Sequence, residues 1–95
     1  MRESVIEKRL VKGVKELGGK CLKMVPTYDN GIPDRLVLYQ GKAIFVEVKR
    51  PGEEPRKLQI LFAEELRRNG FTVKTLDSIE QVDIFVSNLS ANNFL

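Results

Sequence analysis

The chain has 95 residues, of which 42% are hydrophobic and 31% are charged, so it is long enough for one small folded domain and too short for two. Its net charge of +3 permits a polyanionic partner without requiring one. With no histidine and a single cysteine, the chain cannot use Ser-His-Asp hydrolysis, histidine-ligated zinc or an intramolecular disulfide. Any catalysis is expected to use carboxylates, lysine and a hard metal ion.

Hydropathy along the chain gives no indication of a membrane segment or a secretion signal. No apolar run approaches the roughly 20 residues that cross a bilayer, and the first ten residues lack the apolar core of a signal peptide. We therefore expect a cytoplasmic protein with no membrane partner. We expect a single domain over residues 1–95, with the last few residues, including Phe94-Leu95, as a tail or a dimer contact.

The first half of the chain predicts one helix and then strands. Residues 3–17 are expected to form a helix ended by Gly18-Gly19, with apolar residues at helical spacing: Ile6, Leu10, Val14 and Leu17. Glu3 and Glu7 fall inside the apolar arc of this helix, so both carboxylates should point inward. A strand over residues 20–25 and a loop over 26–33, in which Tyr28 could stack on an unpaired base, should follow.

The next two predicted strands cover residues 34–39 and 42–49, separated by Gln40-Gly41. The stretch from Ala43 to Val48 is apolar except for Glu47, which indicates a strand buried on both faces. If the hairpin closes with a two-residue turn, Tyr39 pairs with Lys42 and paired residue numbers add up to a constant. This register places Asp34 opposite Glu47, with Lys49 on the same face.

The second half predicts a charged loop over residues 51–55, a helix over 56–69, a strand over 71–76 and a last helix. The helix over 56–69 carries Leu58, Leu61, Phe62 and Leu66 at helical spacing, and both Gln59 and Glu65 fall within the same arc. Ser78 and Gln81 can form a capping box for the last helix. The element order αβββαβα indicates an α/β (α+β) fold.

Two carboxylates as close as Asp34 and Glu47 repel each other unless a cation or a shared proton intervenes. With oxygen ligands alone, the expected cation is Mg²⁺ or Mn²⁺. Glu7 could supply a third acid, with Glu3 as the alternative. Such a metal would polarise a phosphoryl oxygen and activate water for in-line displacement, while Lys49 stabilises the transition state. Phosphate contacts are expected from nearby cations: Arg35, Arg50, Arg56 and Lys57.

Three segments of the sequence resemble one nuclease family. They are residues 31–35 (GIPDR), residues 45–52 (FVEVKRPG) and Gln59 early in the following helix. Together they are similar to the virus-type replication-repair nuclease (VRR-NUC) domain of the PD-(D/E)XK superfamily, with a match running from about Glu3 to Asp77. The resemblance implies a restriction-endonuclease-like core, in which a mixed sheet is flanked by helices.

The resemblance also implies the activity and the roles of residues. It implies Mg²⁺- or Mn²⁺-dependent cleavage of DNA, with Asp34 and Glu47 as metal ligands, Lys49 as the catalytic lysine, Gln59 facing the site and the helix-one acid at Glu7. Short stand-alone members resemble viral or bacterial enzymes that pair to cut branched DNA. Symmetric cutting of a four-way junction needs two sites related by a two-fold axis, so a homodimeric Holliday junction resolvase is expected.

Other functions stay open at the level of the sequence. A flap-type nuclease would use the same residues on a different DNA structure, and a catalytically inactive nucleic-acid-binding module could retain the fold. A protein-interaction domain would need an apolar patch beyond the core, for which Phe94-Leu95 is the sequence candidate.

Overall fold

A computed structural model describes residues 1–25 and 31–93. The order αβββαβα is confirmed, with the following bounds: α1 Glu3–Glu16, β1 Lys20–Lys23, β2 Arg35–Tyr39, β3 Lys42–Val48, α2 Lys57–Arg68, β4 Thr72–Leu76 and α3 Ile79–Ser90. The predicted role of Tyr28 and the predicted tail at Phe94-Leu95 fall outside the described residues.

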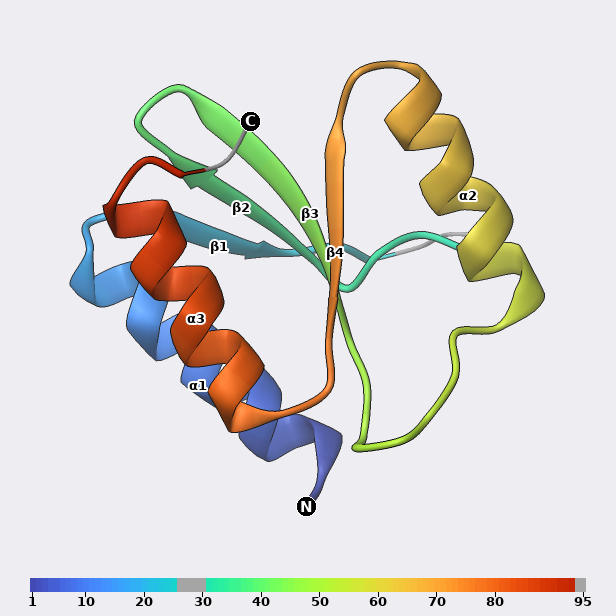
Figure 1. Cartoon of the computed structure of the whole chain (residues 1–95), viewed down its shortest axis with the longest axis horizontal. Coiled ribbons are helices and arrows are strands. Elements are labelled where there is room, and N and C mark those ends of the chain that lie inside the picture. Colours follow the sequence, from blue (N-terminus) through green and yellow to red (C-terminus); the bar gives the residue numbers. More distant parts are fainter. Residues whose placement is uncertain (26–30, 94–95) are drawn as a thin grey trace.

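The strands form one sheet in the order β1-β2-β3-β4. The first three strands are antiparallel neighbours, whereas β3 and β4 run parallel, because the connection through α2 returns β4 in the direction of β3. Helices α1 and α3 lie together on one side of the sheet, and α2 lies apart from them on the other side of β4 (Figure 1). The expected mixed sheet flanked by helices is thus confirmed.

The main core lies between the sheet and the pair α1 and α3. One side of α1 supplies Ile6, Leu10 and Val14, which are fully buried against alternate residues of β3 and against Val82, Phe85 and Leu89 of α3. The two helices approach closely at Gly13, where an added Cβ would lie 2.9 Å from Val86 Cγ2. Glycine at this position therefore lets α1 and α3 share one core.

The hairpin of β2 and β3 has the predicted register. Tyr39 pairs with Lys42, and the ladder continues to Arg35 paired with Val46. Gln40 and Gly41 have φ values of 46° and 80°. A two-residue hairpin turn needs positive φ at both residues to match the twist of the flanking strands. The ladder ends one residue short of Asp34, which is the position that the same register sets opposite Glu47.

Strand β3 is buried on both faces, as its composition predicted. Ile44, Val46 and Val48 belong to the main core, while Glu47 and Lys49 lie on the alternate face and are 2% and 7% exposed. Glu47 in β3 and Lys49 directly after it thus lie in the interior, on the face of the sheet opposite α1 and α3.

The predicted orientation of α2 is wrong in part. Leu58 and Leu61, which the helical wheel placed in the core, are 54% and 49% exposed, while Gln59 and Ala63 are buried. Glu65 is also exposed. In the described chain α2 packs mainly on β4, so the contact is narrow and only the side centred on Gln59 and Ala63 is covered.

The cap of α3 differs from the predicted box in one hydrogen bond. Ser78 Oγ accepts from the Gln81 N–H at 3.1 Å, as expected. The Gln81 Oε1 atom accepts instead from the Asp77 N–H at 2.7 Å. Ser78 still begins the helix.

No helix among the described residues is long and apolar enough to cross a membrane.

Candidate active site

Asp34 lies at the entrance to β2, where two hydrogen bonds hold it. Its carbonyl oxygen accepts from the Met24 N–H at 2.9 Å, and its Oδ2 atom accepts from the Val48 N–H at 2.7 Å. The second bond ties the carboxylate across to β3 just beyond Glu47. It also leaves Oδ1 available for another partner, because a carboxylate has acceptor sites on both oxygens.

Glu47 is the most deeply buried acid of the described chain, at 2% exposure. Its Oε1 atom has no hydrogen-bond partner among the described residues. Burial, followed by the charge of Asp34, raises the pKa of Glu47, and the ammonium of Lys49 partly offsets this shift. A buried carboxylate oxygen without a partner is costly, and a bound cation or a proton would offset that cost.

Lys49 follows β3 directly and is 7% exposed. Its backbone N–H donates to the Leu76 carbonyl at 2.9 Å, which extends the parallel pairing of β3 and β4 past the end of the strand. The alternation of β3 places its side chain on the same face as Glu47. A fixed backbone and a buried stem together restrict where its ammonium can lie.

The two acids on the inner arc of α1, Glu3 and Glu7, have different surroundings. Glu7 Oε2 accepts from Arg35 Nε at 2.7 Å, and the side chains of Arg35 and Glu7 are only 16% and 22% exposed. Arg35 also donates to the Cys21 carbonyl at 3.3 Å. Burial, then the charge of Asp34, raises the pKa of Glu3, while Lys49 opposes the shift. Glu3 is therefore within electrostatic range of the site, and Glu7 has an arginine partner.

Gln59 is 4% exposed at the start of α2. Its Oε1 atom accepts from the Arg56 N–H at 2.8 Å, so the side chain caps the helix. This bond leaves the amide NH₂ group for other partners. The structural role of Gln59 is thus defined, whereas its expected contact with the site stays a prediction.

The four predicted phosphate-binding cations are not equivalent. Arg35 is largely enclosed by Glu7 and Cys21, and Arg50 pairs with Glu53 at 3.0 Å on the surface. Arg56 and Lys57 are exposed at the start of α2. Arg35 is therefore enclosed within the fold, while the other three cations are exposed at the surface.

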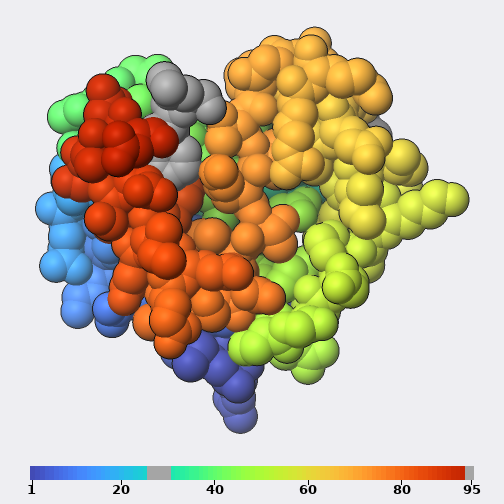
Figure 2. Space-filling view, in the orientation of Figure 1, coloured from blue at the N-terminus to red at the C-terminus, as the bar shows by residue number. Residues whose placement is uncertain are grey.

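Glu53 is a site neighbour that the sequence reasoning did not single out. Its ion pair with Arg50 lowers the pKa of Glu53, and its charge acts on Glu3. The loop that carries Glu53 lies beside the start of α1, where Met1 and residues 50–53 line a shared hollow. Figure 2 shows the N-terminal end of α1 (blue) against this loop (yellow-green). The sequence signal that could have identified Glu53 is that it is an acid in the loop directly after the buried segment with Glu47 and Lys49.

The donor set around Asp34 and Glu47 fits a hard divalent cation, because it consists of carboxylate oxygens. The partnerless Oε1 of Glu47 supports this fit. Within residues 1–25 and 31–93, no group of three or more histidine, cysteine, aspartate or glutamate side chains is already gathered for a metal. A bound cation would therefore draw on two close acids, with water or substrate completing its shell.

Comparison with known proteins identifies the family of the chain. No family model matches the chain. The chain is 47% identical over 79 residues to a protein named "Putative nuclease p44" from Acyrthosiphon pisum secondary endosymbiont phage 1, covering 82% of this chain and 85% of that protein. A solved structure described as "VRR_NUC domain" has a TM-score of 0.83 and 32% identity, covering 90% of this chain and 94% of the other. The chain therefore belongs to the VRR-NUC family of nucleases.

Proposed function

We propose that this chain is a Mg²⁺- or Mn²⁺-dependent endodeoxyribonuclease with Asp34, Glu47 and Lys49 at its centre. The observation that carries the proposal is the buried Glu47, whose Oε1 atom lacks a partner among the described residues and whose pKa is raised by burial and by Asp34. Folding a charged oxygen into the interior in this way is costly unless a cation completes the site. The relative named as a nuclease supports the same reading.

The residues of the site divide the work of phosphodiester hydrolysis. A divalent cation held by Asp34 and Glu47 would supply Lewis-acid activation of the phosphate and of water. The hydrogen bond from the Val48 N–H fixes the Asp34 carboxylate before substrate arrives, so little reorganisation is needed. Lys49 contributes a positive charge toward the developing charge of the transition state. Gln59, at the start of α2, is proposed to orient a polar group of the substrate.

We assign the third acid of the site to Glu3 rather than Glu7. Both Asp34 and Lys49 act electrostatically on Glu3, whereas Glu7 is bonded to Arg35 at 2.7 Å. In this arrangement Glu7 braces Arg35, the residue next to Asp34, and so acts as a positioning residue. Arg50, Arg56 and Lys57 provide phosphate contacts around the site.

The proposed substrate is branched DNA, above all a four-way junction, cut by a homodimer. One domain of this size offers one such site, and paired cuts related by a two-fold axis need two. Flap cleavage by the same residues and DNA binding without cleavage are the competing functions. A flap nuclease differs from a junction resolvase in the DNA structure that it prefers. A binding module differs in that it does not cleave DNA.

A panel of labelled substrates tests the proposal directly. Four-way junction, flap and plain duplex are incubated with Mg²⁺ or Mn²⁺ and with wild type, Asp34→Ala or Lys49→Ala. We expect metal-dependent junction cleavage by wild type and a loss of at least about 100-fold in each variant. Glu80→Ala is the matched control, because Glu80 is an exposed acid of α3.

The outcomes separate the three functions. Preferred cleavage of flaps assigns the flap nuclease, and junction binding without turnover in either metal assigns the inactive binding module. Cleavage that persists unchanged in both Asp34→Ala and Lys49→Ala overturns the site assignment.

A further inference from the structure

Helix α1 carries an exposed row of three lysines that the active site does not use. Lys8, Lys12 and Lys15 are all exposed. At 3.6 residues per turn they fall within roughly 60° of each other around the helix axis. No acid lies within that narrow sector, so the row presents a single sign of charge along most of α1.

The row borders a groove on the α1 side of the sheet that includes Arg35, the first residue of β2. The groove has a volume of about 410 Å³ and is lined by Ser4, Val11, the three lysines and the ion pair of Glu7 with Arg35. Arg35 is the residue that follows Asp34 in the chain. A strand of nucleic acid lying in this groove would therefore pass from the lysines to the entrance of β2.

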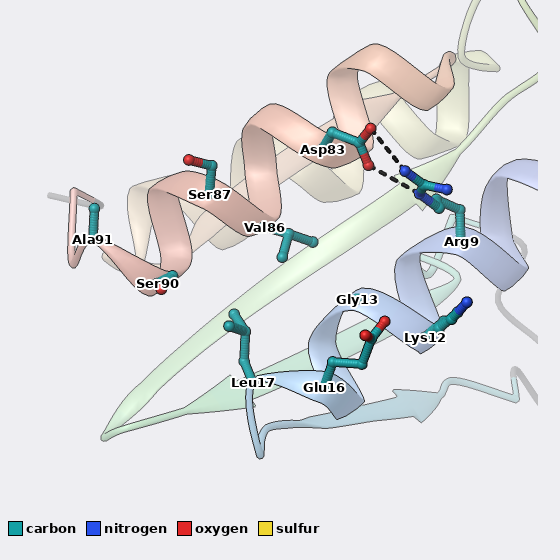
Figure 3. A pocket seen from close by; sticks show the side chains of 10 residues that line it. All are labelled: Arg9, Lys12, Gly13, Glu16, Leu17, Asp83, Val86, Ser87, Ser90 and Ala91. Atoms are coloured by element: carbon teal, nitrogen blue, oxygen red, sulfur yellow. Dashed lines mark hydrogen bonds and ion pairs between the residues drawn. The ribbon is translucent and has the colours of Figure 1, made fainter.

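Basic side chains on the two sides of α1 differ in whether they form ion pairs. On the side facing α3, Arg9 makes a two-point contact with Asp83, with both N–O distances at 3.0 Å (Figure 3). Among residues 1–25 and 31–93, Lys8, Lys12 and Lys15 make no ion pair. The arginine on the side facing α3 is thus paired, whereas the lysines of the row are exposed and make no ion pair among the described residues.

We propose that the lysine row of Lys8, Lys12 and Lys15 is a docking strip for the phosphate backbone of a duplex arm of the DNA substrate. This inference rests on the proposed nuclease function and adds the path by which DNA leaves the site. From Lys8 to Lys15 the helix rises about 10 Å. Each DNA strand carries one phosphate per roughly 3.4 Å of duplex axis, so the row spans about three phosphates.

Salt dependence of DNA binding tests this strip without requiring cleavage. Binding of a fluorescent four-way junction is measured by anisotropy in EDTA over a range of salt concentrations. The triple variant Lys8→Gln, Lys12→Gln, Lys15→Gln should reduce the slope of log K against log salt by about 2 to 3, because each lost phosphate contact contributes about 0.9. Affinity should fall by at least about 10-fold at moderate salt.

A charge-matched variant controls for the loss of net charge. Lys20, Arg68 and Lys74 are exposed on other elements, and replacing all three with glutamine leaves the same net charge as the lysine-row variant. This control should change the slope by less than about 1. Equal slopes for the two triple variants overturn the docking strip, whatever the enzyme cleaves.

Two further readouts distinguish failure of this inference from failure of the proposed function. Bound DNA should protect Lys8, Lys12 and Lys15, but not Lys20 or Lys74, from acetylation in the unmodified chain. The second readout is metal-dependent cleavage of the same four-way junction by the unmodified chain. If DNA protects the three lysines from acetylation but no DNA is cleaved, the docking strip is supported and the nuclease function is rejected. If DNA is cleaved but the lysines are not protected, the nuclease function is supported and the docking strip is rejected.

Discussion

At the scale of single residues, the burial of the Glu47 carboxylate lowers the free energy of unfolding when that group is ionised. Its raised pKa means that the folded state binds a proton more tightly than the unfolded state, whose value is close to 4.5. Stability contributed by this group is therefore complete below the unfolded pKa, decreases as pH rises toward the folded pKa, and is constant above it. A metal bound to the ionised form, as proposed, would offset this penalty.

Glu47→Gln should consequently separate stability from function. Without metal at neutral pH, we expect the variant to unfold with a free energy higher than that of wild type by about 1–3 kcal/mol, the cost of an unsatisfied buried charge. Urea denaturation with and without Mg²⁺ measures this difference. Added Mg²⁺ should stabilise wild type and leave Glu47→Gln unchanged. Equal stabilisation of both proteins would show that Glu47 holds no metal.

Glu3 and Glu7 give a second test at this scale. Glu3→Gln should lower the apparent affinity for Mg²⁺ in the cleavage reaction by at least about 10-fold, with a change in stability within about 0.5 kcal/mol. Glu7→Gln weakens the part-buried bond to Arg35 and should destabilise the fold by on the order of 1 kcal/mol. Metal titrations and urea denaturation of both variants check the assignment, and the opposite pattern would restore Glu7 as the metal-site acid.

At the scale of elements, the hairpin of β2 and β3 was predictable and the exposure of α2 was not. A two-residue turn at Gln40-Gly41 admits only one register for the flanking strands, so local sequence was sufficient to align Asp34 with Glu47. For α2, apolar residues are spread too widely around the helical wheel for their spacing to fix which side is covered. The covered side depends on how α2 packs against β4, and Gln59 occupies that side with Ala63.

The difference between Glu3 and Glu7 was also beyond the sequence. Both acids fall on the inner arc of α1, one turn apart. Which of them meets the site depends on Arg35, whose side chain points to the α1 side of β2 and bonds Glu7. The helical spacing alone could therefore identify Glu3 and Glu7 as inward-facing acids, but not which side chains each of them meets.

Gln59 allows the capping role and the site role of α2 to be separated. Gln59→Ala removes the acceptor for the Arg56 N–H and should destabilise the chain by about 1 kcal/mol. Gln59→Glu keeps an acceptor and should restore most of that stability. If Gln59 also orients substrate through its NH₂ group, turnover should stay low in Gln59→Glu. Recovery of turnover together with stability would leave Gln59 with the capping role alone.

At the scale of the whole molecule, the uncovered side of α2 bears on assembly. Leu58, Ile60 and Leu61 are 54%, 45% and 49% exposed, and the exposed Lys57 and Glu64 lie toward opposite ends of this apolar stretch. If two copies pack α2 against α2 in antiparallel fashion about a two-fold axis, Lys57 meets Glu64 of the partner subunit. Apolar contact in the middle and opposite charges at both ends make this surface complementary to itself.

A charge exchange tests this arrangement of the proposed homodimer. Lys57→Glu and Glu64→Lys should each raise the dimer dissociation constant by about 10-fold or more, since each places like charges together twice across the two-fold axis. The double variant should recover wild-type assembly, because the opposite charges meet again with their positions exchanged. Sedimentation equilibrium without DNA measures the dissociation constants, so the result does not depend on the phosphate contact proposed for Lys57. Single variants that dimerise as well as wild type would exclude α2 as the interface, and a wild-type monomer that still makes paired nicks would exclude the dimer altogether.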